Sequence, residues 1–466
     1  MKINVIFNIA SEIPPYGEGL SQRIARIGRS PGPSPPFDSV SPWGERSEPF
    51  IEEGITPGLL ESVSEKWHSL CHDHDTREFE NPPTLALSHS RTLGFIGRRS
   101  QEDVMSAANK APIDFQVNRD DFRDCRITPG APIEGLESGQ VLFKVDRFAL
   151  TSNNISYAAA GDLLDYWGFF PGPDRWGRIP AMGFGNVIES RCQEVPVGAR
   201  CFGFFPMSRH LVIEASASAS GMVDTASHRA KQAPVYRTYN YTTADTLYDE
   251  DREDQIMLLR GLFMTSFLVD DLFEDENFYG AESSIITSAS SKTSIALGFL
   301  LKRRARGPVI GLTSERNRDF VAGLGCYDEV IGYDQLSSLS KDRPAVMIDM
   351  AGNGEVVAAI HEQLGAQLKY SCAVGGTHWE SKPKPTNLPG PQPEFFFAPA
   401  RIVKRTEDWG GRELQERIGE AWSDFLSFSD QWLKVLHHQG PEALERVYLD
   451  VLTGRIDPQE GHIISL

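Results

Sequence analysis

The segment from residue 283 to 334 alternates between the patterns of strands and helices, and it constrains the fold more than any other part of this chain. SSIITSA (283–289) has the pattern of a strand, SIALGFLLKRRA (294–305) that of a helix and PVIGLTS (308–314) that of a second strand. A strand, a helix and a parallel strand within about 30 residues form a right-handed βαβ crossover, from which nucleotide-binding sheets are built. The segment therefore predicts a parallel sheet with a phosphate held at the turn before the helix.

The same order of elements continues after residue 334. AVMIDMA (345–351) predicts a strand, GEVVAAIHEQLG (354–365) a helix and KYSCAVGG (369–376) another strand. Alternating strands and helices indicate an α/β fold with a doubly wound parallel sheet, whose ligands lie at the carboxyl ends of the strands. We expect three loops at those ends to face one crevice, namely the loops at Thr313, at Asp349 to Gly352 and at Val374 to His378.

The residues after the second strand favour NADPH as the ligand. No acidic residue stands at the tip of this strand, and Arg316 and Arg318 follow it, which suits a 2′-phosphate. Glu315 and Asp319 lie among these arginines and compete for their charge, so NADH remains the alternative. The candidate cofactor-binding residues are Ser288, Ser290, Ser291, Lys292, Thr293, Thr313, Ser314, Arg316, Arg318, Tyr333, Gly352, Val374 and Gly375.

The turn has two further interpretations. SKT (291–293) resembles the end of a P-loop, and Asp349 after its strand resembles the aspartate that holds magnesium in such proteins. A P-loop needs glycine at both ends of the loop, and Ile286 and Ser291 stand at those positions. Small residues at 289–291 still let a pyrophosphate approach the helix N-terminus, as in a Rossmann-like turn. The third interpretation is that SSKT only caps the helix.

Composition limits the classes of partner that the protein can have. The 466 residues are enough for two or three domains, and the net charge of −18 argues against nucleic acid or an anionic membrane as the main partner. The six cysteines form no CxxC pair, so we expect neither a disulfide framework nor a zinc ribbon, and a cytoplasmic location. No apolar run approaches the roughly 18 residues of a membrane-spanning helix.

Four segments differ in pattern. Residues 1–85 are rich in Pro and Ser without a sustained period, and we expect a disordered extension. Residues 110–255 contain short alternating strands such as VLFKVDRFALT, which predict a β-rich domain. Residues 256–385 open with a helical pattern and contain the βαβ unit. Residues 386–466 contain a helical pattern around Phe425 to Leu436, another in ALERVYLDVLTG and a last strand, HIISL, and we expect them to return to the β-rich domain.

This order resembles the medium-chain dehydrogenase/reductase superfamily, particularly its zinc-free quinone and enoyl reductase branch, from about Val141 to Leu466. The strings FALTSNN, FFPGPDRWGRIP, SASSKTSIALGFLL, GLTSERN, GLGCYDEV, VGGTHWE and FFFAP are similar to a narrow family catalogued only as a domain of unknown function. The resemblance implies a GroES-like substrate domain and a Rossmann-like domain, in which Tyr333 covers the adenine. It also leaves a homodimer open, because members of the superfamily commonly pair through edge strands, although no residue here points to one.

Departures from the superfamily shape the expected chemistry. Zinc members carry a catalytic cysteine where this chain has Ser152 to Asn154, a Gly-His-Glu where it has Gly183 to Gly185, and a four-cysteine lobe that this chain lacks. The resemblance therefore implies no metal, and a carbonyl or enoyl oxygen would be polarised by hydrogen-bond donors during hydride transfer from NADPH.

Four residues are candidates for the catalytic side. Tyr157 and Tyr166 lie on the loop that, by resemblance, lines the substrate, where a phenol could donate a proton. Asn154, with its neighbour Asn153, could hold a ribose or a substrate oxygen, and His378 sits where the nicotinamide should end. Each also has a structural interpretation: the tyrosines as packing among the aromatic residues up to Trp176, the asparagines as turn caps and the histidine as a structural residue.

These observations predict a cytoplasmic, zinc-free, NADPH-dependent oxidoreductase that transfers hydride to an activated C=C or C=O of a small molecule. The alternative from another class is a catalytically silent protein that binds nucleotide as a sensor or partner, with the crevice filled by Trp167, Phe169 and Trp176. A P-loop nucleotidase is the third hypothesis.

Overall fold

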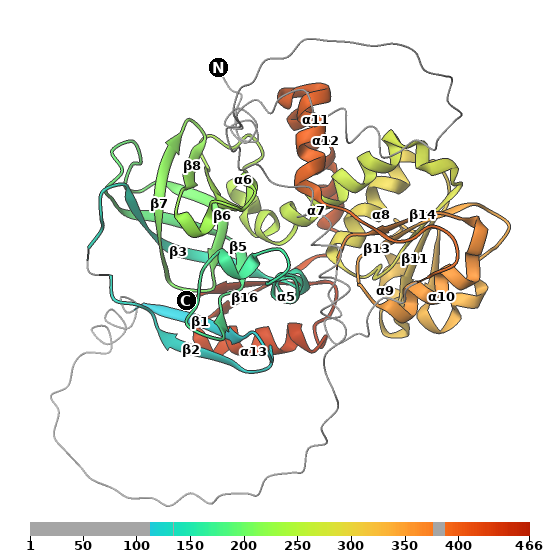
Figure 1. Ribbon diagram of the computed structural model, residues 1–466, viewed down its shortest axis with the longest axis horizontal. Helices are drawn as coiled ribbons and strands as arrows, with labels where there is room; N and C mark the ends of the chain where they lie inside the picture. The colour runs from blue at the N-terminus through green and yellow to red at the C-terminus, as the bar shows by residue number, and fades with distance from the viewer. Residues whose placement is uncertain (1–111, 134, 376–386) are drawn as a thin grey trace, which may run out of the picture.

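The structure is a computed structural model that describes residues 112–133, 135–375 and 387–466. These residues form two bodies that lie side by side, a barrel of antiparallel strands and a parallel sheet covered by helices (Figure 1). The expected extension over residues 1–85 and the candidate His378 lie outside the described residues.

The barrel takes most of its strands from the first half of the described chain. Its strands and those packed beside it are β1 (Ile113–Asn118), β2 (Cys125–Pro129), β3 (Gln140–Leu150), β4 (Trp176–Gly177), β5 (Pro180–Ser190), β6 (Arg200–Pro206), β7 (His210–Ser218), β8 (Gly221–Asp224), β9 (Thr238–Tyr241), β16 (Lys434–Gln439) and β17 (Glu460–Ser465). The ring β3-β5-β6-β9-β8-β7 closes because β7 also pairs with β3. Register shifts in the β3–β5 pairing bend β3, so that its first residues pair with β7 and its last with β17.

The parallel sheet has the strand order of a dinucleotide-binding fold. Its strands are β10 (Ser283–Ile286), β11 (Val309–Thr313), β12 (Glu329–Gly332), β13 (Ala345–Asp349), β14 (Leu368–Ala373) and β15 (Glu394–Phe395). All neighbours are parallel, in the order β12-β11-β10-β13-β14-β15, which is 3-2-1-4-5-6 when the six are counted along the chain. The prediction of an α/β fold with a doubly wound sheet is confirmed.

Helices cover both faces of this sheet. The α-helices are α5 (Ser152–Ala159), α6 (Pro234–Arg237), α7 (Glu253–Asp275), α8 (Lys292–Arg304), α9 (Arg318–Gly323), α10 (Gly354–Leu364), α11 (Ala398–Trp409), α12 (Gly411–Ser429) and α13 (Pro441–Leu452). Successive strand residues point to opposite faces, so Ile286 packs with α7, α8 and α12 while Ile285 packs with α10. Within the described ranges, no helix has the length and hydrophobicity that crossing a bilayer requires.

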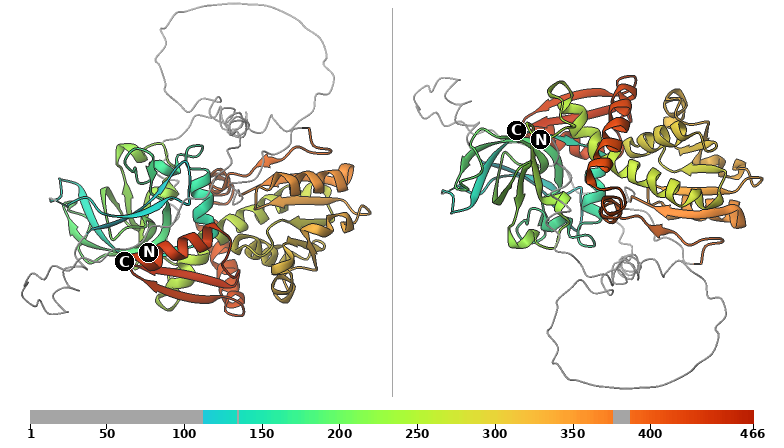
Figure 2. Two further views of the ribbon diagram at one scale, coloured as in Figure 1. Left: turned by 90° about the horizontal axis from the view of Figure 1, so that it is seen from below. Right: turned by 90° about the horizontal axis from the view of Figure 1, so that it is seen from above.

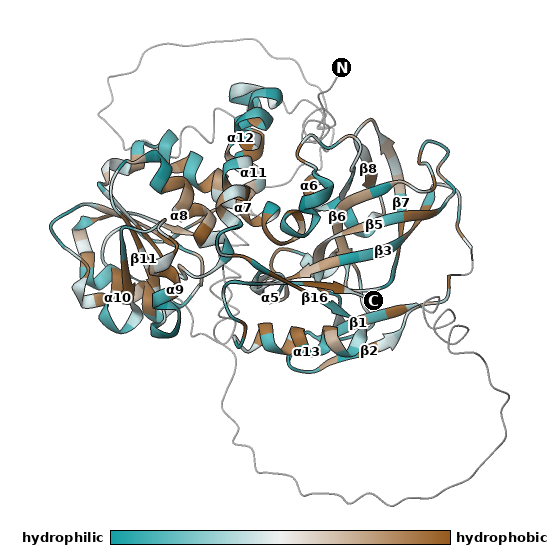
Figure 3. Cartoon of the chain, turned by 180° about the vertical axis from the view of Figure 1, so that it is seen from behind, coloured by the Kyte–Doolittle hydropathy of each residue, from teal (hydrophilic) through white to brown (hydrophobic). Residues whose placement is uncertain are grey.

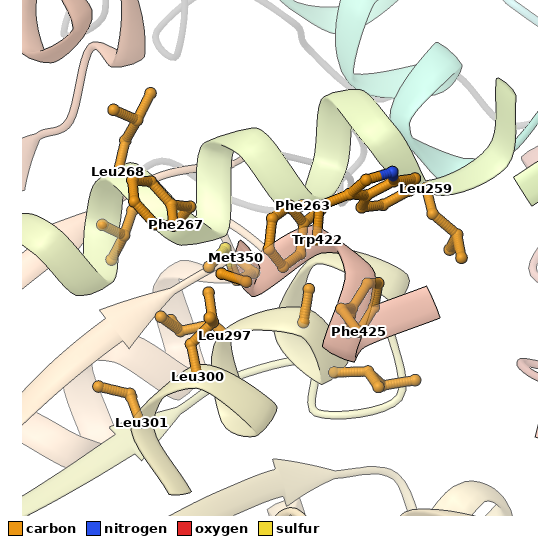
Figure 4. Close-up of a cluster of buried hydrophobic side chains, with 14 of the residues drawn as sticks. Leu259, Phe263, Phe267, Leu268, Leu297, Leu300, Leu301, Met350, Trp422 and Phe425 are labelled. Atoms are coloured by element: carbon orange, nitrogen blue, oxygen red, sulfur yellow. The ribbon is translucent and has the colours of Figure 1, made fainter. Parts of the chain in front are cut away.

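Helix α7 lies between the two bodies and organises the larger core (Figure 4). Phe263 stacks on Phe425 of α12 with ring centroids 5.1 Å apart, and Trp422 lies 5.3 Å from Phe263. A buried phenylalanine of this kind contributes about 3–5 kcal/mol to stability. The same cluster contains Leu259, Phe267, Leu268, Leu297, Leu300, Leu301 and Met350.

The first turn of α7 is joined to the barrel by charged groups. Glu253 is buried, and its carboxylate accepts hydrogen bonds at 2.6 Å from Arg147 of β3 and at 2.6 Å from Arg200 of β6. Burial would raise the pKa of Glu253, but the bonds from Arg200, Arg147 and Tyr248 outweigh it and hold this pKa below its usual range. Removing one partner of such a buried pair costs about 3–5 kcal/mol, so this contact fixes how the two bodies sit.

The C-terminal segment crosses from one body to the other, as its orange to red ribbon shows in Figure 2. Helices α11 and α12 pack beside α7, and β16 and β17 then join the sheet that contains the barrel. Helix α13 carries both hydrophobic and hydrophilic residues (Figure 3), and its Leu444, Val447, Tyr448 and Val451 are buried with the barrel core. This spacing of i, i+3, i+4 and i+7 is that of an amphipathic helix.

Three local expectations differ from the structure. Residues 152–159 form helix α5 rather than a loop, because Thr151 and Asn154 make a capping box. The polar stretch after β7 contains β8 and β9, two strands of four residues that the rest of the barrel completes. The helix around Phe425 ends at Ser429, and Leu436 lies in β16, where pairing with β17 prevails over its helical spacing.

Candidate active site

The strands β10 and β13 are neighbours although β11 and β12 lie between them in the chain, and this reversal of strand order creates the switch point where ligands bind in such sheets. Thr287 follows β10, and its hydroxyl donates to Asp349 Oδ1 over 2.8 Å. The N–H groups of Ala351 and Gly352 donate to the same oxygen at 3.1 and 3.2 Å. A buried carboxylate therefore holds the two strand ends together.

The turn from Ser288 to Ser291 is formed without glycine. Ser288 adopts φ = 51°, a left-handed conformation that favours glycine. Its N–H donates to the Tyr333 hydroxyl over 2.9 Å, and the N–H of Ala289 donates to the carbonyl of Leu312 over 2.9 Å. These two bonds hold the strained residue between the ends of β11 and β12.

Helix α8 begins directly after this turn and leaves donors for an anion. Ser291 caps it by accepting the N–H of Ser294 over 3.2 Å. The N–H groups of Ser290, Lys292 and Thr293 have no acceptor among the described residues, and the first turn contains no acidic residue. Free N–H groups at the positive end of a helix dipole attract a phosphate.

The end of β11 lies against the same turn. The Ser290 hydroxyl accepts a hydrogen bond from Asn317 Nδ2 at 3.0 Å and is 3.5 Å from the Thr313 hydroxyl. Ser314 follows, half-buried, at the start of a short 3-10 turn. Asn317 is not among the residues predicted from the sequence, where its one signal is its place in SERNR beside the two arginines.

The three cations near the turn already have partners. The Lys292 ammonium donates to the carbonyls of Pro458 and Glu460, and Arg316 Nη2 donates to the carbonyls of Gly454 and Ile456. Arg318 pairs at 3.2 Å with Glu315, on the exposed surface. The Arg316 guanidinium keeps further N–H groups, whereas the ammonium of Lys292 points to the C-terminal segment.

Tyr333 is held against the turn. Its hydroxyl accepts the Ser288 N–H, and burial raises the pKa of Tyr333 to about 12. The expectation that its ring covers an adenine stays a prediction.

The loops after β13 and β14 meet at the same edge of the sheet. The N–H of Val374 donates to the carbonyl of Asp349 over 2.9 Å. A Cβ at Gly375 would lie 2.5 Å from the carbonyl oxygen of Met350, so only glycine fits there. Gly352 has φ = 74°, which also favours glycine. These residues line one edge together with the turn at Ser288.

Helix α5 borders a small hollow between the barrel and helix α7. The hollow has a volume of ≈ 20 Å³, about the space of one water molecule. Asn154 is buried as a cap: its Oδ1 accepts the N–H of Thr151 and its Nδ2 donates to the carbonyl of Pro180. Tyr157 is half-buried. The lining residues are Ala149, Thr151, Asn153, Asn154, Tyr157, Met182, Met257, Leu258 and Leu262.

Tyr166 lies in an aromatic cluster beside the hollow rather than in its wall. Its ring contacts Tyr157 and Phe169 with centroids 4.9 and 5.5 Å apart, and its hydroxyl is 3.5 Å from that of Tyr236. The structural interpretation of Tyr166 as packing therefore describes its surroundings. Of the two candidate tyrosines, Tyr157 is the one at the hollow.

The phenols at this site stay protonated at neutral pH. Burial raises the pKa of Tyr157, the nearby Tyr236 adds to this effect, and a hydrogen bond with Asn153 offsets only part of it. Burial likewise raises the pKa of Tyr166 well above its ordinary value. A phenol that stays protonated keeps its O–H available to donate a hydrogen bond to an oxygen on which charge builds.

Potential metal ligands do not cluster in the part of the chain that the structure describes. No set of three or more His, Cys, Asp or Glu side chains is arranged there to hold a metal ion. Gly183 and Gly185 lie in β5, and Ser152 begins α5.

A closed barrel beside a parallel sheet of order 3-2-1-4-5-6 matches the two-body architecture expected from the medium-chain dehydrogenase/reductase resemblance. The chain belongs to the family described as "Protein of unknown function (DUF2855)", whose model matches residues 148–457. No curated protein matches the chain.

Several solved structures are similar to this chain. They include a mutant enoyl thioester reductase from Candida tropicalis, with 12% identity, a TM-score of 0.47 and coverage of 76% of this chain and 100% of that one. CurA from Vibrio vulnificus in complex with NADPH has 13% identity, a TM-score of 0.45 and coverage of 76% and 98%. The yhdH oxidoreductase from Salmonella enterica in complex with NADP has 14% identity, a TM-score of 0.46 and coverage of 76% and 99%.

Proposed function

We propose that this protein is a zinc-free, NADPH-dependent oxidoreductase that reduces an activated C=C or C=O of a small molecule. The observation that carries the proposal is the start of α8 at the switch point, where the N–H groups of Ser290, Lys292 and Thr293 lack acceptors among the described residues. That position in a sheet of order 3-2-1-4-5-6 is where a dinucleotide pyrophosphate binds.

The residues present fit a dinucleotide with a 2′-phosphate. The turn offers N–H groups and the hydroxyls of Ser290 and Thr313, and Arg316 is exposed beside it with N–H groups to spare. A bidentate arginine is well suited to a phosphate. In this proposal, residues 256–385 hold the cofactor, and residues 110–255 with the last strands hold the substrate. The loops at Gly352 and at Val374 to Gly375 border the nicotinamide.

NADPH supplies the hydride when it is bound. The chain contributes hydrogen bonds and shape: the Tyr157 phenol donates to the substrate oxygen on which negative charge builds, and Asn153 orients that phenol. Met182 and Met257 line the hollow, and their flexible side chains can rearrange to admit a substrate. The apolar wall then excludes water from the reacting atoms.

One observation favours the second candidate, a nucleotide-binding sensor without catalysis. The hollow of ≈ 20 Å³ is far smaller than a substrate. A sensor needs the nucleotide site but no substrate pocket, so it would keep the turn and leave the hollow closed. The P-loop hypothesis gains no such support, because the two positions that need glycine carry Ile286, in β10, and Ser291, the N-cap of α8.

Calorimetric titration of the full chain with NADPH, NADH and Mg-ATP tests the proposal. NADPH should bind more tightly than NADH, and Arg316→Ala should reduce that preference by about 5- to 150-fold, the equivalent of a charged hydrogen bond of about 1–3 kcal/mol. Arg318→Ala is the matched control and should change the preference little, because Arg318 pairs with Glu315.

Binding of Mg-ATP alone, or of no nucleotide, would contradict the proposal. If NADPH binds, its oxidation with a panel of enones and quinones separates the two candidates. Turnover supports the oxidoreductase, whereas binding without turnover supports the sensor. A cytoplasmic location, a small-molecule substrate and a homodimer remain predictions from the sequence.

A further inference from the structure

Residues 453–460, which we call the strap, run from the end of α13 to the first residue of β17 and pass the cations beside the proposed nucleotide-binding turn. The carbonyls of Gly454 and Ile456 accept hydrogen bonds from Arg316 Nη2 at 3.0 and 3.1 Å. The carbonyls of Pro458 and Glu460 accept hydrogen bonds from Lys292 Nζ at 3.2 and 2.6 Å. Alternate carbonyls of one short segment therefore hold both cations that flank the turn.

The strap also brings negative charge to this place. Burial would raise the pKa of Asp457, but hydrogen bonds from Gln459 and the charges of Lys434 and Arg316 outweigh it and keep the pKa below its usual range. Asp457 and Glu460 in turn favour the charged form of Lys292. Carbonyl and carboxylate oxygens around an arginine and a lysine offer these cations the same kind of contact as phosphate oxygens do.

Polar contacts hold most of the strap in place. Residues 453–455 and Asp457 are exposed, and Ile456 packs only partly buried against the barrel core. Inside the strap, Asp457 accepts the backbone N–H and the side-chain amide of Gln459 at 3.1 and 2.9 Å. A segment with few buried apolar contacts opens at low cost in free energy.

We propose that the strap competes with the cofactor for Arg316 and Lys292: in the free protein its carbonyls occupy these cations, and the phosphates of the dinucleotide displace it. The inference rests on the proposed function and adds a regulatory device to that site. Because only the fraction of molecules with an open strap binds, the apparent affinity for NADPH is lower than the intrinsic one by that fraction.

The strap can be loosened without touching either cation. Asp457→Ala removes the two bonds with Gln459 and one negative charge, and the matched control Asp342→Ala removes an exposed aspartate from the loop before β13, at the opposite edge of the sheet. Asp457→Ala should bind NADPH about 2- to 10-fold more tightly than the wild type, the equivalent of one hydrogen bond, and the control should not. Gln459→Ala keeps the charge and should act in the same direction, which provides a second variant if the first does not fold.

Amide hydrogen exchange of the full chain supplies the second readout. The N–H groups of Arg455 and Glu460 donate to carbonyls within α13 and the strap. Saturating NADPH should speed their exchange in the wild type, because a displaced strap loses these bonds. Slower exchange with NADPH, or weaker binding by Asp457→Ala, would show that the strap closes on the cofactor and would overturn the proposal. If neither protein binds NADPH, the proposed function itself fails, and the strap proposal fails with it.

Discussion

The two parts of the proposed site are formed by different groups. On the proposed cofactor side, backbone groups predominate: a left-handed Ser288 and the N–H groups at the start of α8, beside the Asp349 carboxylate that joins two strand ends. On the proposed substrate side, side chains predominate: Tyr157 beside an aromatic cluster, and two methionines around a hollow of ≈ 20 Å³. Backbone geometry survives large changes of sequence, and this explains how the first site forms without the expected glycines. A site formed by side chains depends on each residue, so single substitutions should change the proposed substrate side more.

The largest effect is expected from a single negative charge placed at the proposed cofactor site. Thr293→Asp places a carboxylate in the first turn of α8, where it stabilises the helix but repels a phosphate. At an effective dielectric constant near that of a protein surface, like charges about 4 Å apart repel by about 4 kcal/mol, so NADPH affinity should fall at least about 100-fold. Calorimetric titration measures the loss, and Thr293→Ser is the control. Unchanged affinity in a folded Thr293→Asp variant would place the cofactor elsewhere.

A second change removes the group that joins the strands at the switch point. Asp349→Ala deprives the Thr287 hydroxyl and the N–H groups of Ala351 and Gly352 of their acceptor. Leaving buried donors unsatisfied costs about 1–3 kcal/mol for each group, and we expect a loss of about 2–4 kcal/mol in the free energy of unfolding, measured in urea. The exposed Asp342→Ala should change it by less than about 0.5 kcal/mol. Equal effects of the two variants would refute the role given to Asp349.

The substrate side is tested by two tyrosines with similar surroundings. Tyr157→Phe removes a hydroxyl at the hollow, and Tyr166→Phe removes one inside the aromatic cluster. With an enone or quinone found by screening, Tyr157→Phe should lower kcat about 10- to 100-fold, as the loss of a donor to a developing oxyanion does, and should leave the KM for NADPH unchanged. Tyr166→Phe should stay within about 3-fold of the wild type. A larger effect of Tyr166→Phe would reverse the assignment.

The smallest expected effect concerns the charge of Lys292, whose ammonium donates to carbonyls of the strap. Burial lowers its pKa to about 8, against the opposing influence of Glu460 and Asp457, and His462 also lies in its field. The unfolded chain keeps an ordinary lysine pKa of about 10.4, so between these values it binds more protons than the folded protein and the free energy of unfolding rises with pH. The stability of the wild type relative to Lys292→Met should therefore increase between about pH 8 and 10.

Urea unfolding across that pH range shows whether the stability difference increases with pH, and the exposed Lys369→Met is the control. A difference that does not change with pH would mean that Lys292 is not buried as a cation beside the strap.

The sequence predicted the parallel sheet well, because its strands are apolar and its helices amphipathic with clear boundaries. It also located the turn at residues 288–293, because an apolar strand pattern ends before it and a helical pattern begins after it. It missed α5, because a capping box of Thr151 and Asn154 looks like any polar loop, and it missed β8 and β9, whose four residues each gain their stability from neighbours in the barrel.

The strap could not have been predicted at all. Its contacts use backbone carbonyls, which every residue has, and they join groups such as Arg316 and Gly454 that are 138 residues apart in the chain. For the same reason the sequence indicated only Glu315 and Asp319 as competitors for Arg316, and none for Lys292. Only the folded chain brings the C-terminal segment to these cations.

The central claim is that a dinucleotide binds where the turn at Ser288 meets the start of α8. The most direct measurement is a structure of the full chain determined with NADPH. We expect the pyrophosphate against the N–H groups of Ser290, Lys292 and Thr293, the 2′-phosphate at Arg316 and the strap displaced from both cations. A nucleotide bound elsewhere, or a turn that stays empty at saturating NADPH, would contradict it.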